Sequence, residues 1–187
     1  VEIGNRGMHF VDNGMDAVFE LTYDLNENVE VVFGTQYNKF YATDIGRYYV
    51  NYAGLDANLY NDEPFGSPAG LAALSATTLV EYTNHYEKTD LVVQIDNIAD
   101  LAGGSIQALV GVESITNRYA AEYDKHSEGG LVGGSAGNSG GGNRDIDSIF
   151  GEILLPVMDN LEVTASFRRD DYSDVGEADS FKLGALY

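Results

Sequence analysis

The chain has 187 residues, of which 30 are acidic and only ten are Lys or Arg, so its formal net charge at pH 7 is −20. Affinity for nucleic acid comes mainly from Lys and Arg on phosphates, so this charge excludes a nucleic acid as partner. The sequence has no Cys, which excludes a disulfide framework, a thiolate nucleophile and a Cys-based zinc site. Its 13 Tyr, 22 Gly and only three Pro are typical of a β-rich protein with many turns.

No run of about 18 or more apolar residues occurs, so the sequence predicts no transmembrane helix. Membrane-spanning β-strands are only about ten residues long and alternate in polarity, so a search designed for helices does not detect them. The chain begins with Val1 rather than with Met, which indicates a processed terminus or an excised fragment.

The first third of the chain predicts a short edge strand and one hairpin. Residues 1–14 carry a weak strand signal that ends in the turn triplet Asp12-Asn13-Gly14. Residues 15–25 and 29–41 then alternate between apolar and polar side chains, with a turn at residues 25–28 between them. This spacing predicts two antiparallel strands joined by a short turn.

Residues 44–83 have a different character and predict a long loop. They hold several Tyr residues and then a run of small residues from Ser67 to Thr78. Ser67 followed by Pro68 fits the cap and first turn of a short helix, which Thr77 and Val80 weaken at its end. Loops of this length in a compact domain are uncommon unless they are functional.

The rest of the chain predicts two more hairpins. Residues 84–97 and 104–121 form the second, and residues 123–143, which are rich in Gly, predict a flexible loop. Residues 144–157 and 161–172 form the third, across the short turn Met158-Asp159-Asn160. A medium loop at 173–180 leads to a last strand at 181–187, whose partner is expected beyond the end of the chain.

Together these elements predict an all-β fold: an antiparallel up-and-down meander of about seven or eight strands, part of or resembling an outer-membrane β-barrel. We expect one partial barrel domain over residues 1–187, with long loops at 44–83 and 123–143. Short and long connections alternate, and alternate connections of a meander emerge at opposite ends. The two long loops are therefore expected at the same end, as in outer-membrane barrels with short periplasmic turns and long extracellular loops.

Several stretches resemble TonB-dependent outer-membrane receptors. They are Phe150-Gly151-Glu152 with Leu154-Leu155-Pro156, then Leu161-Glu162 and the segment 168–176 (RRDDYSDVG), and Gly111-Val112-Glu113 with Arg118 before the Gly-rich loop. The resemblance implies part of a 22-stranded barrel around an N-terminal plug. It also implies uptake of a scarce ligand, such as an iron chelate, cobalamin or an oligosaccharide, with energy from TonB.

The sequence departs from that family in three respects: it has no plug domain, no N-terminal segment that contacts TonB, and no closing C-terminal strand that ends in Phe. The chain would be roughly a third of such a barrel, and contact with TonB would belong to the missing N-terminal part of a parent protein. A sheet of this size leaves two unpaired edges, so we expect edge-to-edge self-association, unless the sheet curls into a small closed barrel.

Charged residues after the third turn offer two interpretations. Residues Arg168, Arg169, Asp170, Asp171 and Asp174 form either an ion-pair ladder at a strand end that faces the lumen or a calcium site. The ladder is favoured because the spacing lacks the glycine and terminal Glu of an EF-hand loop. In the first long loop Asp56, Asp62 and Glu63 can bind calcium or a polyol, but a solvated acidic loop is favoured.

Aromatic residues of the first long loop are the candidate ligand contacts. Aromatic rings in a long loop stack on a sugar or an aromatic chelate, and they also serve as interface residues of a membrane barrel or as a small loop core. The candidates are Tyr48, Tyr49, Tyr52, Tyr60 and Phe65.

No pattern predicts an enzyme, a metal site or a cofactor. His9, His85 and His126 are far apart in the sequence, and no HExxH, GxSxG or phosphate-loop motif occurs. Asp170 and Asp171 are adjacent, so on a strand they point to opposite faces and do not form an acid/base pair.

The leading hypothesis is therefore a non-enzymatic fragment of a receptor in the bacterial outer membrane that takes up a small molecule through extracellular loops. The alternative is a soluble secreted β-domain that binds carbohydrate or calcium. The two differ in where the apolar face of the sheet points, because a membrane barrel exposes it and a soluble sheet covers it with a second layer. A glycosidase on a β-scaffold ranks third and requires two carboxylates across a cleft.

Overall fold

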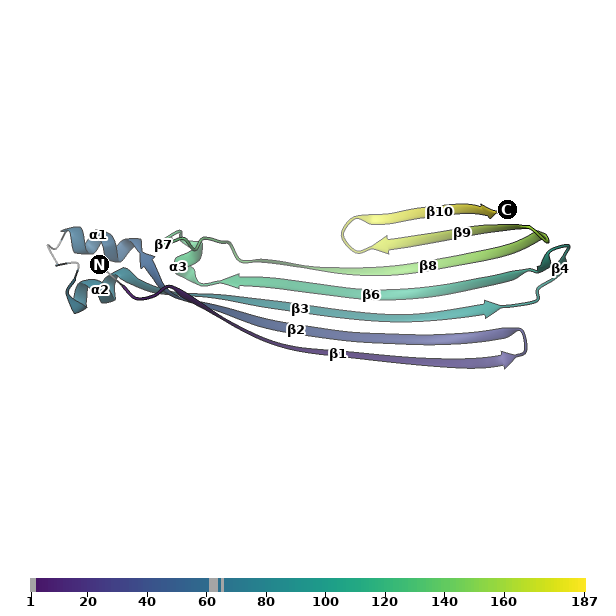
Figure 1. Cartoon of the computed structure of the whole chain (residues 1–187), viewed down its shortest axis with the longest axis horizontal. Coiled ribbons are helices and arrows are strands. Elements are labelled where there is room, and N and C mark those ends of the chain that lie inside the picture. The colour runs from purple at the N-terminus through teal and green to yellow at the C-terminus, as the bar shows by residue number, and fades with distance from the viewer. Residues whose placement is uncertain (1–2, 61–63, 65) are drawn as a thin grey trace. The chain divides into compact units, whose positions relative to one another are not determined.

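The structure is a computed structural model that describes residues 3–60, 64 and 66–187. Seven long strands form one antiparallel sheet in the order β1-β2-β3-β6-β8-β9-β10, so neighbours in the sheet follow one another along the chain (Figure 1). The expected all-β meander is thus confirmed. The strands are β1 (Gly7–Asn26), β2 (Val29–Asn51), β3 (Ser75–Ile95), β6 (Gln107–Tyr123), β8 (Gly140–Met158), β9 (Leu161–Tyr172) and β10 (Gly176–Leu186).

Three short helices and three two-residue strands complete the described fold. The helices are α1 (Tyr52–Tyr60), α2 (Pro68–Leu74) and α3 (Lys125–Glu128). The short strands are β4 (Asp100–Leu101) and β5 (Gly104–Ser105), which pair with each other, and β7 (Val132–Gly133), which pairs with β2. No helix within the described ranges has both the length and the apolar character needed to cross a membrane.

The residues group into two compact units, and the long strands contribute to both. Unit 1 comprises residues 1–15, 39–84 and 118–142, and unit 2 comprises residues 16–38, 85–117 and 143–187. Among the described residues, the buried hydrophobic side chains all belong to unit 1. They are Ala42, Tyr49, Leu74, Val80 and Val132.

The two long connections meet in unit 1. Val50 and Asn51 of β2 pair with Gly133 and Val132 of β7, and the Tyr52 amide donates to the Leu131 carbonyl at 2.8 Å. The prediction that both long loops leave the same end is therefore confirmed.

Both loops are shorter and more regular than the sequence predicts. Strand β2 continues to Asn51 and β3 begins at Ser75, so the first connection covers residues 52–74 instead of 44–83. The expected helix at Ser67 and Pro68 is α2, and the Ser67 hydroxyl accepts from the Gly70 amide at 3.0 Å. The Gly-rich segment contains α3 and β7, because Asp124 caps the helix and β7 finds a partner in β2.

Two other turn predictions are wrong. The Asp12-Asn13-Gly14 triplet lies inside the continuous strand β1, since pairing with β2 outweighs local turn preference. The medium loop at 173–180 is a tight turn at 173–175, after which Gly176 pairs with Tyr172. In that turn the Ser173 amide donates to the Asp145 carbonyl at 2.9 Å, so the turn is fixed to β8.

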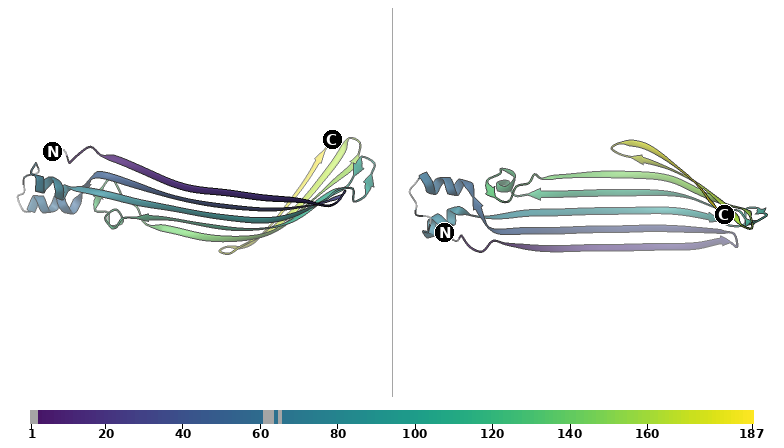
Figure 2. Two further views of the ribbon diagram at one scale, coloured as in Figure 1. Left: turned by 90° about the horizontal axis from the view of Figure 1, so that it is seen from below. Right: turned by 45° about the horizontal axis from the view of Figure 1, so that its top comes forward.

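The third predicted hairpin is confirmed, and β10 extends it. Strands β8 and β9 pair from Ile146 opposite Tyr172 to Met158 opposite Leu161, with a bulge near Met158. Strand β10 pairs with β9 in turn, so its partner lies within the chain rather than beyond its end (Figure 2). Strands β1 and β10 end the sheet order, and within the described residues each has one neighbour.

Gly111 shows how closely adjacent strands pack in unit 2. A Cβ atom added to Gly111 would overlap Cζ of the Phe150 ring on β8, so the ring or the backbone would have to shift to accept it.

We expect Gly111→Ala to lower the free energy of unfolding by about 1–3 kcal/mol, because the added methyl group forces the Phe150 ring out of its rotamer. Gly184→Ala on β10 is the matched control, since nothing lies within 4 Å of its added Cβ. Chemical denaturation of both variants measures the difference. Equal midpoints for the two would contradict the close contact.

Candidate functional site

Tyr49 is the centre of a small core at the end of β2 in unit 1. Its side chain is only 5% exposed, and the Arg6 guanidinium carbon lies 4.1 Å from the centre of its ring. Arg6 also donates from Nη2 to the Gly134 carbonyl at 3.2 Å. Arg6 therefore links the Tyr49 ring to the Gly-rich connection, and little of that ring remains for a ligand.

Tyr48 and Tyr52 present more of their rings to solvent. Tyr48 has a φ of 61°, a left-handed conformation that is rare for an aromatic residue, and its ring lies against Gly4. The Tyr52 hydroxyl lies beside Gly133 of β7. The structure thus brings Tyr48, Tyr49 and Tyr52 to one end of β2.

The other two aromatic candidates are Tyr60 and Phe65. The backbone of Tyr60 ends α1, but its side chain lies outside the described residues, as does Phe65. Their role as ligand contacts stays a prediction.

Asp124 organises the Gly-rich connection. Its carboxylate accepts hydrogen bonds from the amides of Leu79, His126 and Ser127, at 3.0, 3.0 and 3.1 Å, and from the Ser127 hydroxyl at 2.7 Å. Burial alone would raise the pKa of Asp124, but these four donors outweigh it and hold the pKa below its ordinary value. The carboxylate joins the start of β3 to α3.

The sheet of unit 2 has two chemically different faces, which the strand register defines. Residues directly opposite each other on antiparallel strands share a face, and successive residues alternate between faces. The polar face carries Asp90, Lys88, Glu113, Ser148, Phe150, Glu152, Ser166, Arg168, Asp170, Ser180 and Lys182. The apolar face carries Leu91, Val110, Val112, Ile149, Ile153, Leu155, Val163, Ala165, Phe167, Phe181 and Leu183.

The apolar face is open to solvent in the isolated chain. Phe181 is 78% exposed and Leu183 is 79% exposed, and the ring of Phe181 lies 5.0 Å from that of Phe167. Two buried side chains of the described part of unit 2 are polar: Ser148 is 6% exposed and Asp170 is 8% exposed. Unit 2 therefore reverses the usual pattern of a water-soluble sheet.

Arg168 is the centre of an ion-pair network on the polar face. It donates from Nε to Asp170 at 2.8 Å, and from Nη2 to Glu113 at 2.6 Å and to the Ser148 hydroxyl at 2.8 Å. Lys88 lies 3.0 Å from the second oxygen of Glu113. The network joins β3, β6, β8 and β9. In it Lys88 and Arg168 pair with the carboxylates of Glu113 and Asp170.

The predicted ion-pair ladder is present, but it is divided between the faces. Arg168 and Asp170 pair on the polar face, whereas Arg169 turns the other way and binds Asp179 of β10 at 2.7 Å. Asp174 binds Arg144 at 2.6 Å in the turn. In the described residues no group of three or more His, Asp or Glu is arranged to hold a metal ion.

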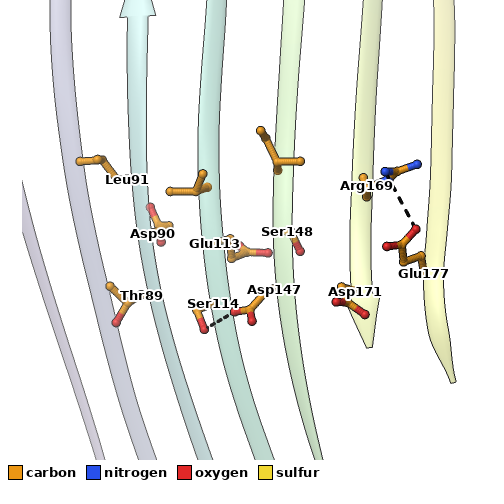
Figure 3. A pocket seen from close by; sticks show the side chains of 12 residues that line it. Thr89, Asp90, Leu91, Glu113, Ser114, Asp147, Ser148, Arg169, Asp171 and Glu177 are labelled. Atoms are coloured by element: carbon orange, nitrogen blue, oxygen red, sulfur yellow. Dashed lines mark hydrogen bonds and ion pairs between the residues drawn. The ribbon is translucent and has the colours of Figure 1, made fainter. Parts of the chain in front are cut away.

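At the end of the apolar face the sheet has a shallow hollow of about 530 Å³. Figure 3 shows Arg169 directed toward Glu177 and Ser114 toward Asp147 at this hollow. Asp147, Asp171 and Glu177 lie opposite one another on β8, β9 and β10. On this face of β8, β9 and β10, charged side chains therefore lie next to the end of the row of apolar side chains.

Sequence reasoning missed Glu113, Lys88 and Arg144 as partners of the ladder. Their positions follow from strand pairing between segments that are distant in the sequence. The only signal was the Gly111-Val112-Glu113 stretch, which places Gly111 and Glu113 on one face of a strand.

Comparisons with known proteins found solved structures only. No family model and no curated protein matches the chain. A variant of the ferric enterobactin receptor PfeA from Pseudomonas aeruginosa matches at 12% identity and a TM-score of 0.38, over 97% of this chain and 31% of the receptor. The siderophore receptor PirA from the same organism matches at 14% identity and a TM-score of 0.35, over 93% of this chain and 30% of PirA. The chain thus spans about a third of the length of these receptors.

We predict that acid loosens the Gly-rich connection. Because the folded-state pKa of Asp124 is lowered, its contribution to stability is complete above the ordinary Asp value of about 3.9 and is lost as the pH falls through the lower folded value. Hydrogen exchange of the His126 and Ser127 amides at pH 7 and pH 3 measures this.

Asp124→Asn is the control, because it removes the titrating carboxylate and should abolish the difference in protection of these two amides between pH 7 and pH 3. Equal protection of the wild-type amides at both pH values, after correction for intrinsic exchange, would contradict the role of Asp124.

Proposed function

We propose that the chain is a β-sheet segment of a bacterial outer-membrane receptor that takes up a scarce small molecule in a TonB-dependent manner. The observation that carries the proposal is the reversed polarity of unit 2, whose apolar face is exposed and whose polar face holds the buried Ser148 and Asp170. Lipid is the solvent that suits such an apolar face. Contact with TonB belongs to another part of the parent protein.

The size of the apolar face fits this proposal. On β8 it extends from Ile149 to Leu155, about 20 Å at ~3.4 Å per residue. The apolar band of outer-membrane barrels is about 25 Å tall, with an interior that is polar. The Arg168 network supplies such an interior, since it lies on the opposite face.

The alternative, a soluble secreted domain that binds carbohydrate or calcium, requires a second layer over the apolar face. The exposure of Phe181 and Leu183 favours the membrane proposal instead. We place the protein in the outer membrane and assign it transport rather than enzymatic catalysis.

Within this proposal the exposed rings of Tyr48 and Tyr52 contact the ligand, together with Tyr60 and Phe65, while the buried Tyr49 belongs to the core of unit 1. Tyr48 and Tyr52 are assigned to the ligand and Tyr49 is not, because a ligand stacks only on an accessible aromatic face.

The membrane part of the proposal predicts that the chain folds into lipid vesicles and that a charge on the apolar face opposes this. Val110→Lys should reduce the free energy of folding in vesicles by about 2–4 kcal/mol, the cost of a Lys that faces lipid. Gln94→Lys, on the polar face of β3, is the matched control and should cost little. Folding in buffer without lipid, or equal losses for the two variants, would contradict the proposal.

The ligand part of the proposal predicts that Tyr48 and Tyr52 affect ligand affinity, whereas Tyr49 affects thermal stability. Ferric enterobactin, cyanocobalamin and maltohexaose serve as probes of the three ligand classes in calorimetric titrations. The double variant Tyr48→Ala/Tyr52→Ala should weaken the probe that binds by about tenfold, or ~1.4 kcal/mol. Tyr49→Ala should instead lower the thermal midpoint. Unchanged affinity in the double variant, or binding of none of the probes, would contradict these assignments.

A further inference from the structure

The apolar face of unit 2 has a second hollow, centred on Gly151 of β8. Gly151 lies opposite Phe167 of β9 and therefore belongs to the apolar face, where it has no side chain to fill the space. This apolar hollow has a volume of about 450 Å³. The side chains of the apolar face that line it are those of Val110, Ile153, Ala165, Phe167 and Phe181.

The apolar hollow is followed along the strands by the hollow of about 530 Å³ described above, here called the charged hollow. On three strands, successive residues of the same face line first one hollow and then the other. These pairs are Val110 and Val112 on β6, Gly151 and Ile149 on β8, and Phe167 and Arg169 on β9.

The length of the apolar stretch matches one layer of acyl chains. From Ile149 to Ile153 it extends over about 14 Å at ~3.4 Å per residue. Half of the ~30 Å hydrocarbon core of a bilayer is about 15 Å. An acyl chain in the apolar hollow thus brings its head group to the charged hollow.

Three carboxylates face one another in the charged hollow (Figure 3). Asp171 lies opposite Asp147 of β8 and opposite Glu177 of β10. Like charges directly opposite each other on neighbouring strands repel. In the part of the chain that the structure describes, Asp171 has no ion-pair partner, and Asp147 accepts a hydrogen bond from the neutral Ser114 hydroxyl at 2.7 Å. This row of carboxylates therefore favours a cationic group at the end of the apolar hollow.

Arg169 retains a donor for a phosphate beside these carboxylates. Its Nε and Nη2 atoms donate to Asp179 at 2.7 and 2.9 Å, so that carboxylate offsets its charge. Its Nη1 atom lies 3.9 Å from Glu177, which is too far for a hydrogen bond. A zwitterionic head group fits this arrangement, with its phosphate at Arg169 and its ammonium group at Asp171. A purely anionic head group would be repelled by the three carboxylates.

We propose that the two hollows together bind one molecule of phosphatidylethanolamine. One acyl chain lies over Gly151 and beside the ring of Phe167, and the primary ammonium group donates to Asp171 and the carboxylates next to it. Phosphatidylglycerol lacks the cation, and phosphatidylcholine has no N–H group to donate. This assignment rests on the proposed function, because a sheet embedded in a membrane meets lipid on this face, and it adds which lipid is held there.

The test is native mass spectrometry of the full chain, released from lauryldimethylamine oxide micelles. The micelles contain phosphatidylethanolamine, phosphatidylglycerol and phosphatidylcholine in equal amounts and with identical acyl chains. Adducts with phosphatidylethanolamine should exceed those with each of the other lipids by about tenfold, as expected for hydrogen bonds between charged groups. Asp171→Lys should reverse the preference in favour of phosphatidylglycerol. Gly151→Leu, which fills the apolar hollow, should reduce the adducts of all three lipids by about tenfold.

Two variants on β1 are the matched controls. Asp24→Lys changes the net charge by the same amount as Asp171→Lys, and Ala17→Leu enlarges an exposed small side chain outside both hollows. Both should keep the wild-type pattern of adducts. Thermal unfolding checks that Gly151→Leu folds, and Asp171→Lys tests the head-group site independently.

Equal adducts of the three lipids in the wild type, or an unchanged preference in Asp171→Lys, would overturn the assignment of phosphatidylethanolamine. Folding into vesicles is measured separately, so such a result leaves the membrane proposal standing. Failure to fold into vesicles would instead contradict the proposed function.

Discussion

Antiparallel pairing between sequential strands is the constraint on which the rest of the structure depends. Each long strand lies beside the one before it, and the register decides which side chains share a face. A shift of one residue between β8 and β9 would place Arg168 among apolar side chains and Phe167 among charges. The hydrogen-bonded turns and the Gly111–Phe150 contact help to hold the register.

The division of unit 2 into a polar and an apolar face follows from this register. It explains why the polar side chains of Ser148 and Asp170 are buried. Ser148 and Asp170 are buried because Arg168 closes over them, and their hydrogen bonds satisfy them. No comparable burial is needed on the other face if lipid surrounds it. Unit 1 differs, since its small core around Tyr49 and Val132 fixes the two long connections together.

Much of this fold could be predicted from the sequence because period-two alternation is a local property. The hairpin of β8 and β9, the helix that starts after Ser67 and the common end of the long connections all follow from alternation, capping residues and connection lengths. The extension of β2 to Asn51 and the passage of β1 through Asp12-Asn13-Gly14 depend on partner strands, which local preference does not reveal. For the same reason the sequence pointed to Arg168 and Asp170 but not to Glu113.

The most direct test of the central claim is solid-state NMR of the chain in lipid bilayers, with magnetisation transferred from the acyl chains to the protein. Our account predicts that Val110, Ile153 and Leu183 receive this magnetisation first, and that Glu152, Ser166 and Lys182 on the other face receive it later. Equal build-up on both faces, or earlier build-up on the polar face, would contradict the claim that the apolar face contacts lipid.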